Sequence, residues 1–341
     1  MELDQLKWTD VRDFGVLGKG WTDTENFYDR FPARAHGLVR DEVWMLSRNP
    51  SGMRVHFLTD SKVIAVDWTL PADKPIGADH MPAMGVSGLD LYVRHRGSWR
   101  WLGASRLDGP GRNRKFLFPD VLLLSGRHEY MLYLPLYNSL ESLLIGIAPG
   151  ASLGRPKPLK AKPICFYGTS ITQGGCASRP GMAYPAILGR RLEQPFLNFG
   201  FSGNARLEPE VARLLAELDP SVFVLDPLAN VPADGAAKLA EAFIRTLRSV
   251  HPKVPIVLVE HVIFQNACFI KSRMDEIRTR NKAIRKVYLK LRKEGMKHLR
   301  YVPADNLLGH DGEATVDGVH FTDLGFMRFA DVLEPVLRKL L

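Results

Sequence analysis

Hydrophobic and polar positions follow two patterns along the chain, and the pattern changes near residue 160. In the later part, short apolar runs alternate with segments of helical periodicity. The apolar runs are residues 163–168, 195–200, 221–226, 254–260 and 298–303, and the helical segments are 181–193, 208–218, 235–249, 275–294 and 323–340. Apolar runs separated by helices are typical of parallel strands that are covered on both faces. We therefore expect an α/β domain over residues 163–341, with a five-stranded parallel sheet.

The earlier part contains short β-rich runs separated by Gly, Pro, Asn and Asp. These runs are residues 43–49, 53–60, 63–70, 89–95, 98–104, 130–137 and 143–148. Their spacing predicts an antiparallel β-sandwich within residues 1–150, preceded by an N-terminal extension over residues 1–40. Residues 151–162 are rich in Pro, Gly and Lys and are expected to link the two domains.

Composition narrows the class of protein only in part. The chain has 341 residues, which favours two domains, and it contains no apolar run of 18 or more residues, so we expect no membrane span. The first residues, MELDQLKWTD, lack a signal-peptide pattern, which favours a cytoplasmic protein, or a periplasmic or secreted one if a leader was removed. The three cysteines show no paired spacing, so neither a disulfide framework nor a structural metal site is expected.

Most of the net positive charge lies in one segment. Residues 271–300 carry 12 basic and 3 acidic side chains. Apolar positions there share one helical face: Ile277, Ile284, Val287, Tyr288 and Leu291. The pattern favours a surface helix whose cations face water, with a polyanion-binding patch as the alternative. No aromatic residues are interleaved with the cations, so nucleic acid is not an expected partner.

Polar residues follow each predicted strand of the α/β domain. Their positions in the chain are Ser170, Gly203, Asn230, His261 and the pair Asp317 and His320. Because parallel strands end at the same edge of a sheet, these residues are expected to gather at that edge. The loop after the first strand, FYGTSITQGG, lacks the spacings of a phosphate-binding loop, a dinucleotide fingerprint or a G-x-S-x-G elbow, so none of these three motifs explains it.

The residues at this edge fit nucleophilic catalysis. A serine hydroxyl reacts only when a base takes its proton, and His320 is the candidate base for Ser170. Asp317 lies three residues before His320, close enough to orient the imidazole. The Ser170 N–H, the Gly203 N–H and the Asn230 amide are candidate donors for an oxyanion hole.

These residues resemble the blocks of the SGNH (GDSL-type) hydrolases. GTSIT matches the first block with Ser170 as nucleophile, Gly203 and Asn230 match the second and third, and DGVH matches the final Asp-x-x-His. Upstream, GLDLYVRHRGSWRWLG is similar to a domain with a G-x-D-L-Y signature that precedes some SGNH esterases. The resemblance implies a flavodoxin-like hydrolase domain behind a jelly-roll-like β-sandwich, and ester hydrolysis without cofactor or metal. Two positions depart from the family pattern: Thr169 replaces the usual aspartate, and Asn230 stands in LAN rather than G-x-N-D.

The predicted activity is hydrolysis of a small O-acyl ester, with deacetylation of a carbohydrate as one form. Arg179 is a candidate ligand for a substrate carboxylate, and His261 a candidate supporting or substrate-binding residue. Trp99 and Trp101 alternate on one strand and are expected to pack in the core, or to stack on a sugar if their face is open.

Two other functions remain open at this point. One is a carbohydrate-binding or scaffold protein with a vestigial hydrolase domain. The other is a metallohydrolase that uses His261, His310 and His320, although their spacing matches no familiar zinc motif. The oligomeric state does not follow from the sequence.

Overall fold

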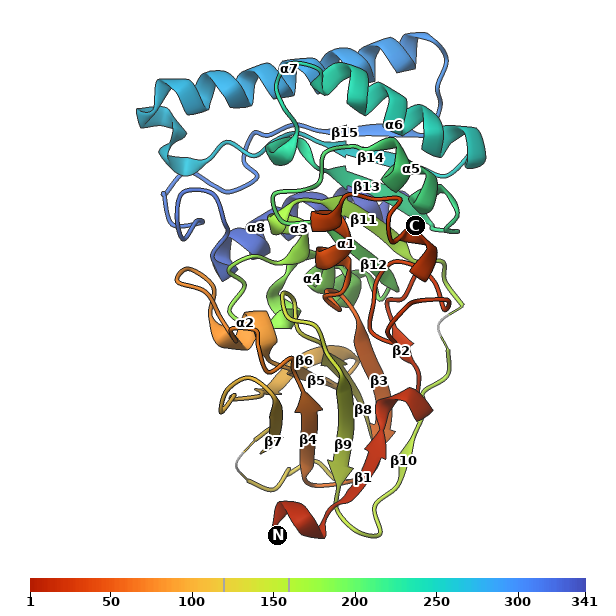
Figure 1. The fold of residues 1–341 in the computed structure, drawn as a ribbon, viewed down its shortest axis with the longest axis vertical. Coiled ribbons are helices and arrows are strands. Elements are labelled where there is room, and N and C mark those ends of the chain that lie inside the picture. The colour runs from red at the N-terminus through yellow and green to blue at the C-terminus, as the bar shows by residue number, and fades with distance from the viewer. Residues whose placement is uncertain (119, 159) are drawn as a thin grey trace.

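A computed structural model describes residues 1–118, 120–158 and 160–341. A β-rich part occupies one end of the elongated molecule and an α/β part the other (Figure 1). The N-terminus lies at the β-rich end, and helix α7 (Lys271–Lys293) lies at the opposite end (Figure 1). Within the described residues, every helix is either too short or too polar to span a lipid bilayer.

The β-rich part is a sandwich of two antiparallel sheets. The first has the order β1 (Lys7–Asp10), β9 (Ser142–Ile147), β4 (Ile64–Thr69), β7 (Arg112–Phe116). The second has the order β10 (Leu153–Gly154), β3 (Arg54–Thr59), β8 (His128–Tyr133), β5 (Asp90–His95), β6 (Ser98–Ala104), and β2 (Val16–Leu17) also pairs with β3. Alternate apolar side chains such as Phe57, Trp68, Leu132 and Ile145 fill the space between the sheets. The predicted sandwich is therefore confirmed.

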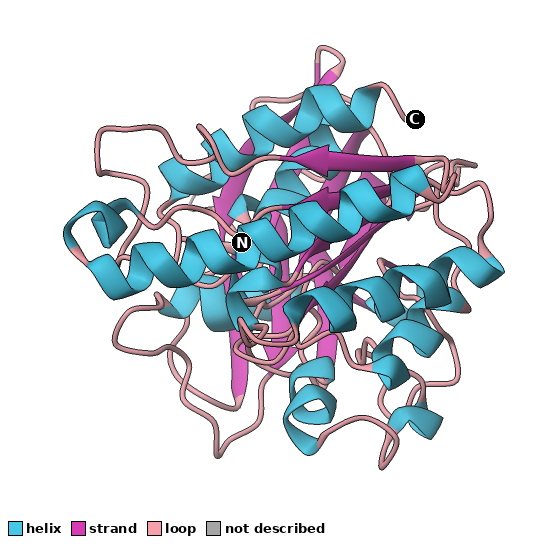
Figure 2. Cartoon of the chain, turned by 90° about the horizontal axis from the view of Figure 1, so that it is seen from above, coloured by secondary structure: helices cyan, strands magenta, loops and turns pink. Residues whose placement is uncertain are grey.

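The α/β part contains a five-stranded parallel sheet. Its order is β12 (Phe196–Gly200), β11 (Ile164–Gly168), β13 (Val222–Asp226), β14 (Ile256–Val259), β15 (Leu299–Val302). In chain order this is 2-1-3-4-5, the flavodoxin-like arrangement. Helices surround this sheet (Figure 2). The longer ones are α4 (Tyr184–Leu192), α5 (Pro209–Ala216), α6 (Ala236–Val250), α7 and α8 (Asp323–Arg338).

The two faces of the parallel sheet bury separate cores. Alternate residues of β11 show this: Cys165 and Tyr167 join a core with α5, α6 and α7, whereas Ile164 and Phe166 join a core with α4 and α8. All five β11 residues are buried, because helices cover both faces. The predicted doubly covered sheet is confirmed, and its strand ends fall within two residues of those predicted.

Residues 43–49, predicted as a strand, instead belong largely to helix α1 (Asp41–Ser47). The segment begins with Asp41 and Glu42, which favour a helix N-terminus, and it buries Val43, Trp44 and Ser47 on one side. This spacing of i, i+1 and i+4 is helical, and the aromatic and β-branched composition concealed it.

The N-terminal extension crosses to the α/β part. Phe31 stacks on Phe199 of β12 with ring centroids 5.7 Å apart. The buried Arg30 guanidinium donates to the carbonyl oxygens of Asn198 and Gly200, each at 2.8 Å. Trp44 joins the core beneath α5 and α6. A boundary at residue 150 therefore does not separate the two cores, because the α/β core includes side chains from the first 50 residues.

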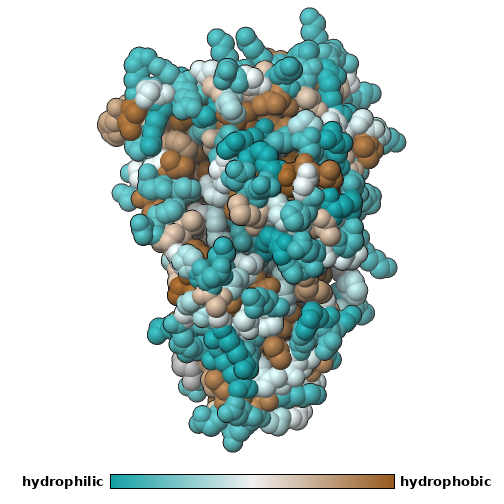
Figure 3. All heavy atoms as spheres, in the orientation of Figure 1, coloured by the Kyte–Doolittle hydropathy of each residue, from teal (hydrophilic) through white to brown (hydrophobic). Residues whose placement is uncertain are grey.

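The remaining helices are short. They are η1 (Leu3–Gln5), η2 (Val11–Asp13), η3 (Ala33–Ala35), α2 (Ala83–Ser87), α3 (Ser170–Gln173), η4 (Pro180–Met182), η5 (Leu228–Asn230) and η6 (Gln265–Phe269). Within the predicted linker, Leu153 and Gly154 form β10 and complete the second sheet. The end of the molecule formed by α7 is covered largely by hydrophilic residues (Figure 3), which agrees with the expected solvated face of that helix.

Candidate active site

A tight strand–turn–helix unit positions Ser170. Strand β11 ends at Gly168, and Ser170 is the first residue of α3. Thr169 caps α3, because its hydroxyl accepts a hydrogen bond from the Ile171 N–H at 3.2 Å. A Cβ atom on Gly168 would lie 2.0 Å from the Thr172 hydroxyl oxygen, so the turn requires glycine there. The unit therefore holds Ser170 at the carboxyl edge of the sheet.

Ser170, His320 and Asp317 form a continuous hydrogen-bonded chain. The His320 Nε2 atom lies 2.9 Å from Ser170 Oγ, and His320 Nδ1 donates to Asp317 Oδ2 at 2.7 Å. The other carboxylate oxygen, Asp317 Oδ1, accepts from the backbone N–H groups of Val319 and His320 at 2.9 and 2.8 Å. Partial burial opposes ionisation, but these bonds outweigh it and lower the pKa of Asp317 to about 2. Asp317 is thus a fixed carboxylate that selects the His320 tautomer with an accepting Nε2.

The candidate oxyanion donors are placed differently. Asn230 lies in η5 and lines the same cavity as Ser170. The Ala205 N–H donates to Asn230 Oδ1 at 3.4 Å, which leaves the amide nitrogen available as a donor. Gly203 follows β12 with a φ of +69°, a conformation that favours glycine. Gly203 is not among the residues that line the cavity, so its contribution stays a prediction.

The cavity beside Ser170 has a volume of about 330 Å³. Ser170, Asn230 and Val319 line it, and α7 contributes Arg273 and Arg280. The other lining residues are Thr169, Ile171, Ala229, His261, Phe264, Glu276 and Ile277. The sequence predicted that the cations of α7 face solvent, but the first turns of α7 border this cavity.

Comparison with known proteins decides the family. A model of the GDSL-like lipase/acylhydrolase family matches residues 161–338. The chain belongs to this family. A second family model, for the GxDLY domain at the N-terminus of SGNH-hydrolase-type esterases, matches residues 6–153. The predicted family and its two-domain architecture are confirmed.

Several solved structures share the fold of this GDSL-like chain. A predicted GDSL-like lipase from Bacteroides ovatus is 33% identical, with a TM-score of 0.92 over 98% of both chains. A salicylyl-acyltransferase from a tetracycline biosynthetic pathway is 21% identical, with a TM-score of 0.77 over 98% of both chains. A family two carbohydrate esterase from Clostridium thermocellum is 16% identical, with a TM-score of 0.60 over 85% of this chain and 92% of that one. A search of curated proteins found no match.

The GxDLY domain reaches the triad, which the sequence did not predict. The Tyr137 hydroxyl donates to the carbonyl oxygen of Ser170 at 3.1 Å. Gln173 of α3 donates to the Leu136 carbonyl oxygen at 3.1 Å, so the same loop supports the nucleophile helix. The ring of His80 lies beside that of His320, with centroids 5.3 Å apart. No sequence motif marks His80 or Tyr137, because only the packing of the two domains brings His80 to His320 and Tyr137 to Ser170.

Arg179 takes part in contacts between the domains. Its Nη1 atom donates to Asp90 Oδ2 at 2.8 Å and to the Tyr92 hydroxyl at 2.5 Å, the Asp and Tyr of the GxDLY signature. Its guanidinium also lies 5.1 Å from the Trp101 ring. Arg179 is therefore committed to the GxDLY domain and does not line the cavity beside Ser170. Trp101 is 53% exposed, so the expectation that it packs in the core is wrong.

His261 lines the cavity, yet the residue as a whole is only 2% exposed. Burial lowers the pKa of His261 to about 4, so its imidazole is neutral at pH 7. The ring nitrogen Nδ1 donates to the Val262 carbonyl oxygen at 2.6 Å. The structure thus places His261 in the lining of the same cavity as Ser170, at the sheet edge that the sequence predicted, in a neutral and fixed form.

One group of potential metal ligands occurs in the part of the chain that the structure describes. Ligand atoms of His80, Cys176 and His320 lie within 4.8 Å of one another. Both nitrogens of His320 already serve Asp317 and Ser170, and burial raises the pKa of the Cys176 thiol to about 12. These donors therefore do not fit a resident catalytic metal. His310 lies elsewhere, with Nε2 at 2.5 Å from Asn306 Oδ1, so the alternative trio of histidines is not assembled.

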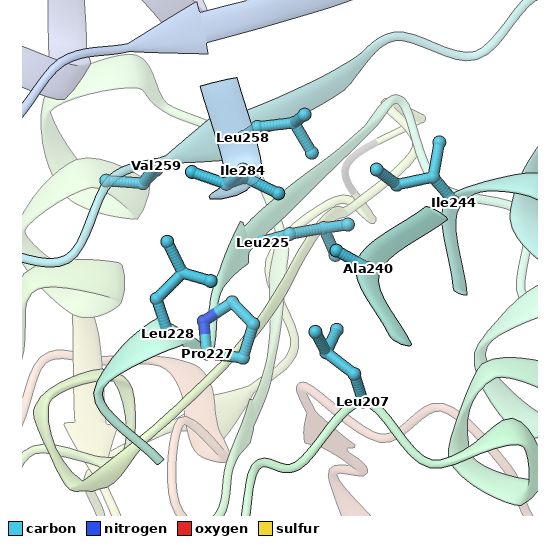
Figure 4. A pocket seen from close by; sticks show the side chains of 9 residues that line it. All are labelled: Leu207, Leu225, Pro227, Leu228, Ala240, Ile244, Leu258, Val259 and Ile284. Atoms are coloured by element: carbon cyan, nitrogen blue, oxygen red, sulfur yellow. The ribbon is translucent and has the colours of Figure 1, made fainter. Parts of the chain in front are cut away.

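A further cavity lies inside the α/β core but does not serve as a site. It is about 10 Å³ in volume and lies between the sheet and helices α6 and α7 (Figure 4). Its lining consists of Leu207, Leu225, Pro227, Leu228, Ala240, Ile244, Leu258, Val259 and Ile284. A space of this size holds at most about one water molecule, and an apolar lining gives that water no partners. This cavity is a packing void.

Proposed function

We propose that the chain is a serine esterase that hydrolyses a small O-acyl ester. The single observation that carries this proposal is the hydrogen-bonded chain from Ser170 through His320 to Asp317. A serine in such a chain is activated as a nucleophile. The alternative of a scaffold with a vestigial hydrolase domain is disfavoured, because hydrogen bonds hold all three side chains in working geometry.

The geometry supports a two-step acyl transfer. Ser170 Oγ attacks the ester carbonyl carbon while His320 Nε2 takes the hydroxyl proton, and Asp317 stabilises the resulting imidazolium. The Ser170 N–H and the Asn230 amide donate to the oxyanion, with the Gly203 N–H as the further donor that the family pattern suggests. His320 then protonates the leaving alcohol, which leaves an acyl group on Ser170 Oγ. Water attacks this acyl group while His320 takes its proton, and His320 returns the proton to Ser170 Oγ as the acid is released.

For the alcohol component of the ester, we favour a carbohydrate. Structures with this fold include family two carbohydrate esterases and an acetyl xylan esterase, although at 16% identity or less they support the fold alone. The cavity beside Ser170, at about 330 Å³, accommodates a small acyl group or a single sugar unit and not a folded polymer.

The decisive experiment compares Ser170→Ala with Ser272→Ala, a matched change at an exposed position of α7. Hydrolysis of p-nitrophenyl acetate and of acetylated sugars is measured, together with circular dichroism and labelling by a serine-directed phosphonate. We expect Ser170→Ala to lower kcat by about four to six powers of ten and to abolish labelling. Ser272→Ala should match the parent protein. A folded Ser170→Ala variant with full activity would end the proposal, and a parent protein inactive on every ester would favour the vestigial alternative.

A further inference from the structure

The cavity beside Ser170 contains a cation without an acidic partner. Arg273 lies on the first turn of α7, and its Nη1 atom donates to the neutral Asn266 side chain at 3.0 Å. Among the described residues, no carboxylate oxygen lies within 4.0 Å of its guanidinium. A half-buried arginine that has only an amide partner keeps most of its donors available.

The other charged side chains of the cavity neutralise each other. Arg280 pairs with Glu276 at 2.5 Å and also donates to the Val231 carbonyl oxygen at 2.7 Å. His261 is neutral because burial lowers its pKa. The charge of Arg273 is therefore left uncompensated among the lining residues, which together carry a net positive charge.

Arg273 also lies close to the triad loop. A Cβ atom built on Gly318 would lie 3.3 Å from Arg273 Nη1, and Gly318 follows Asp317 directly. The carboxylate of Asp317 is engaged by His320 and two backbone N–H groups, so it is not free to fold back onto Arg273. An anion bound by Arg273 would thus lie in the same cavity as an ester held at Ser170.

We propose that Arg273 binds a carboxylate carried by the ester substrate, so that the protein prefers acidic esters over neutral ones. This inference rests on the proposed esterase function. A guanidinium matches a carboxylate with two parallel hydrogen bonds, and the partly enclosed cavity strengthens the attraction. The carboxylate has two sources, the acyl group or the alcohol, which for a sugar is a uronic acid. From either source, the group that contacts Arg273 is a carboxylate.

Two pairs of substrates separate these sources. The acyl pair is p-nitrophenyl acetate and mono-p-nitrophenyl succinate, and the alcohol pair is acetylated methyl glucoside and acetylated methyl glucuronide. The variants are Arg273→Gln, Arg273→Lys and the control Arg278→Gln, which lies on the exposed side of α7 outside the cavity. For each pair, the ratio of kcat/KM on the acidic ester to that on the neutral ester is measured.

We expect Arg273→Gln to lower this ratio about 10- to 100-fold in one pair, mainly through KM, which is the usual effect of losing a charge-assisted hydrogen bond. Arg273→Lys should recover part of the ratio, because it restores the charge without the planar fork. Arg278→Gln should leave the ratio unchanged. Unchanged ratios in both pairs for Arg273→Gln, or equal changes for the control, would overturn the inference while leaving the esterase function intact.

A binding measurement separates the inference from the proposed function. Succinate and methyl glucuronide are titrated calorimetrically against Ser170→Ala, and against Ser170→Ala combined with Arg273→Gln. At least one anion should bind the first variant about tenfold or more tightly than the second. Such binding, together with a parent protein that hydrolyses none of the esters, would contradict the proposed function alone. Equal binding of both anions to the two variants would contradict the Arg273 site alone.

Discussion

Replacement of Asp90 by alanine tests how the GxDLY domain is fastened to the hydrolase domain. The Asp90 side chain is fully buried. One carboxylate oxygen accepts from Arg179 and from the Gly181 N–H, each at 2.8 Å, and the other accepts from Trp101 Nε1 at 2.9 Å. Burial raises the pKa of Asp90, although Arg179 opposes the shift. The substitution therefore removes the one acceptor shared by three donors from two domains.

The magnitude follows from what is left unpaired. The buried Gly181 N–H loses its partner, which costs about 1–3 kcal/mol. Breaking the buried ion pair costs about 3–5 kcal/mol more. The low ends of the two ranges, about 1 and about 3 kcal/mol, apply because Arg179 keeps the Tyr92 hydroxyl. We therefore expect a loss of about 4 kcal/mol in the free energy of unfolding. An unfolding entropy of about 2.1 cal/mol/K per residue over 341 residues converts this loss into a fall in Tm of about 6 °C, if the chain unfolds as one unit.

Differential scanning calorimetry measures this fall directly. The control is Asp108→Ala, which removes an exposed ion pair to Lys115 and should lower the free energy of unfolding by less than about 1 kcal/mol. Asp90→Asn should fall between the two, because its amide oxygen still accepts a hydrogen bond. If Asp90→Ala lowers Tm no more than Asp108→Ala does, the reasoning about the shared acceptor is refuted.

Two further variants test the site itself, and a third tests the stability contribution of the buried Asp226 at the end of β13. Asn230→Ala should lower kcat by about 10²–10³ with a small change in KM and normal phosphonate labelling, and a normal kcat would remove Asn230 from the oxyanion hole. Tyr137→Phe should lower kcat less than about tenfold, because Gly174 and Gly175 still donate to the Ser170 carbonyl oxygen at 2.8 and 2.7 Å; a larger loss with an unchanged Tm would assign the hydroxyl a direct role. Burial raises the pKa of Asp226 well above 3.8, so the parent protein should lose stability as pH rises above that value. Asp226→Asn has no carboxyl group to titrate, so its stability should not fall with pH for this reason. The Tm of Asp226→Asn relative to that of the parent should therefore rise from pH 5 to pH 8, and a constant difference in Tm would contradict the raised pKa.

The sequence predicted the α/β sheet and its triad because both depend on local patterns. Apolar runs that alternate with helical segments leave few other architectures, and parallel strands end at one edge. Ser170 and the Asp317–His320 pair are each set by a short turn, so their residue types carried enough information. The hydrogen bonds between them agree with the family pattern, even though Thr169 and the residues around Asn230 depart from it.

Local patterns did not lead to a correct prediction of helix α1 or of the contacts that the N-terminal extension makes. The extension packs onto β12 although about 170 residues of chain separate Arg30 from Asn198. The run at residues 43–49 has the composition of a strand, but the apolar surface of the α/β core stabilises it as a helix through Val43 and Trp44.

The sequence by itself determined the family and the sheet and indicated the candidate residues Ser170, Asp317 and His320, because each of these rests on a short local motif. Only the tertiary structure decided the surroundings of those groups. Arg179 has the chemistry of a substrate ligand but pairs with the buried Asp90, whereas Arg273, which the sequence assigned to solvent, lines the same cavity as Ser170. Tyr137 comes to Ser170 from another domain. The physical reason is that the role of a charged group or a hydroxyl depends on the partner it contacts in the folded protein. That partner is set by the packing of surfaces that are distant in the sequence, not by neighbouring residues in the chain.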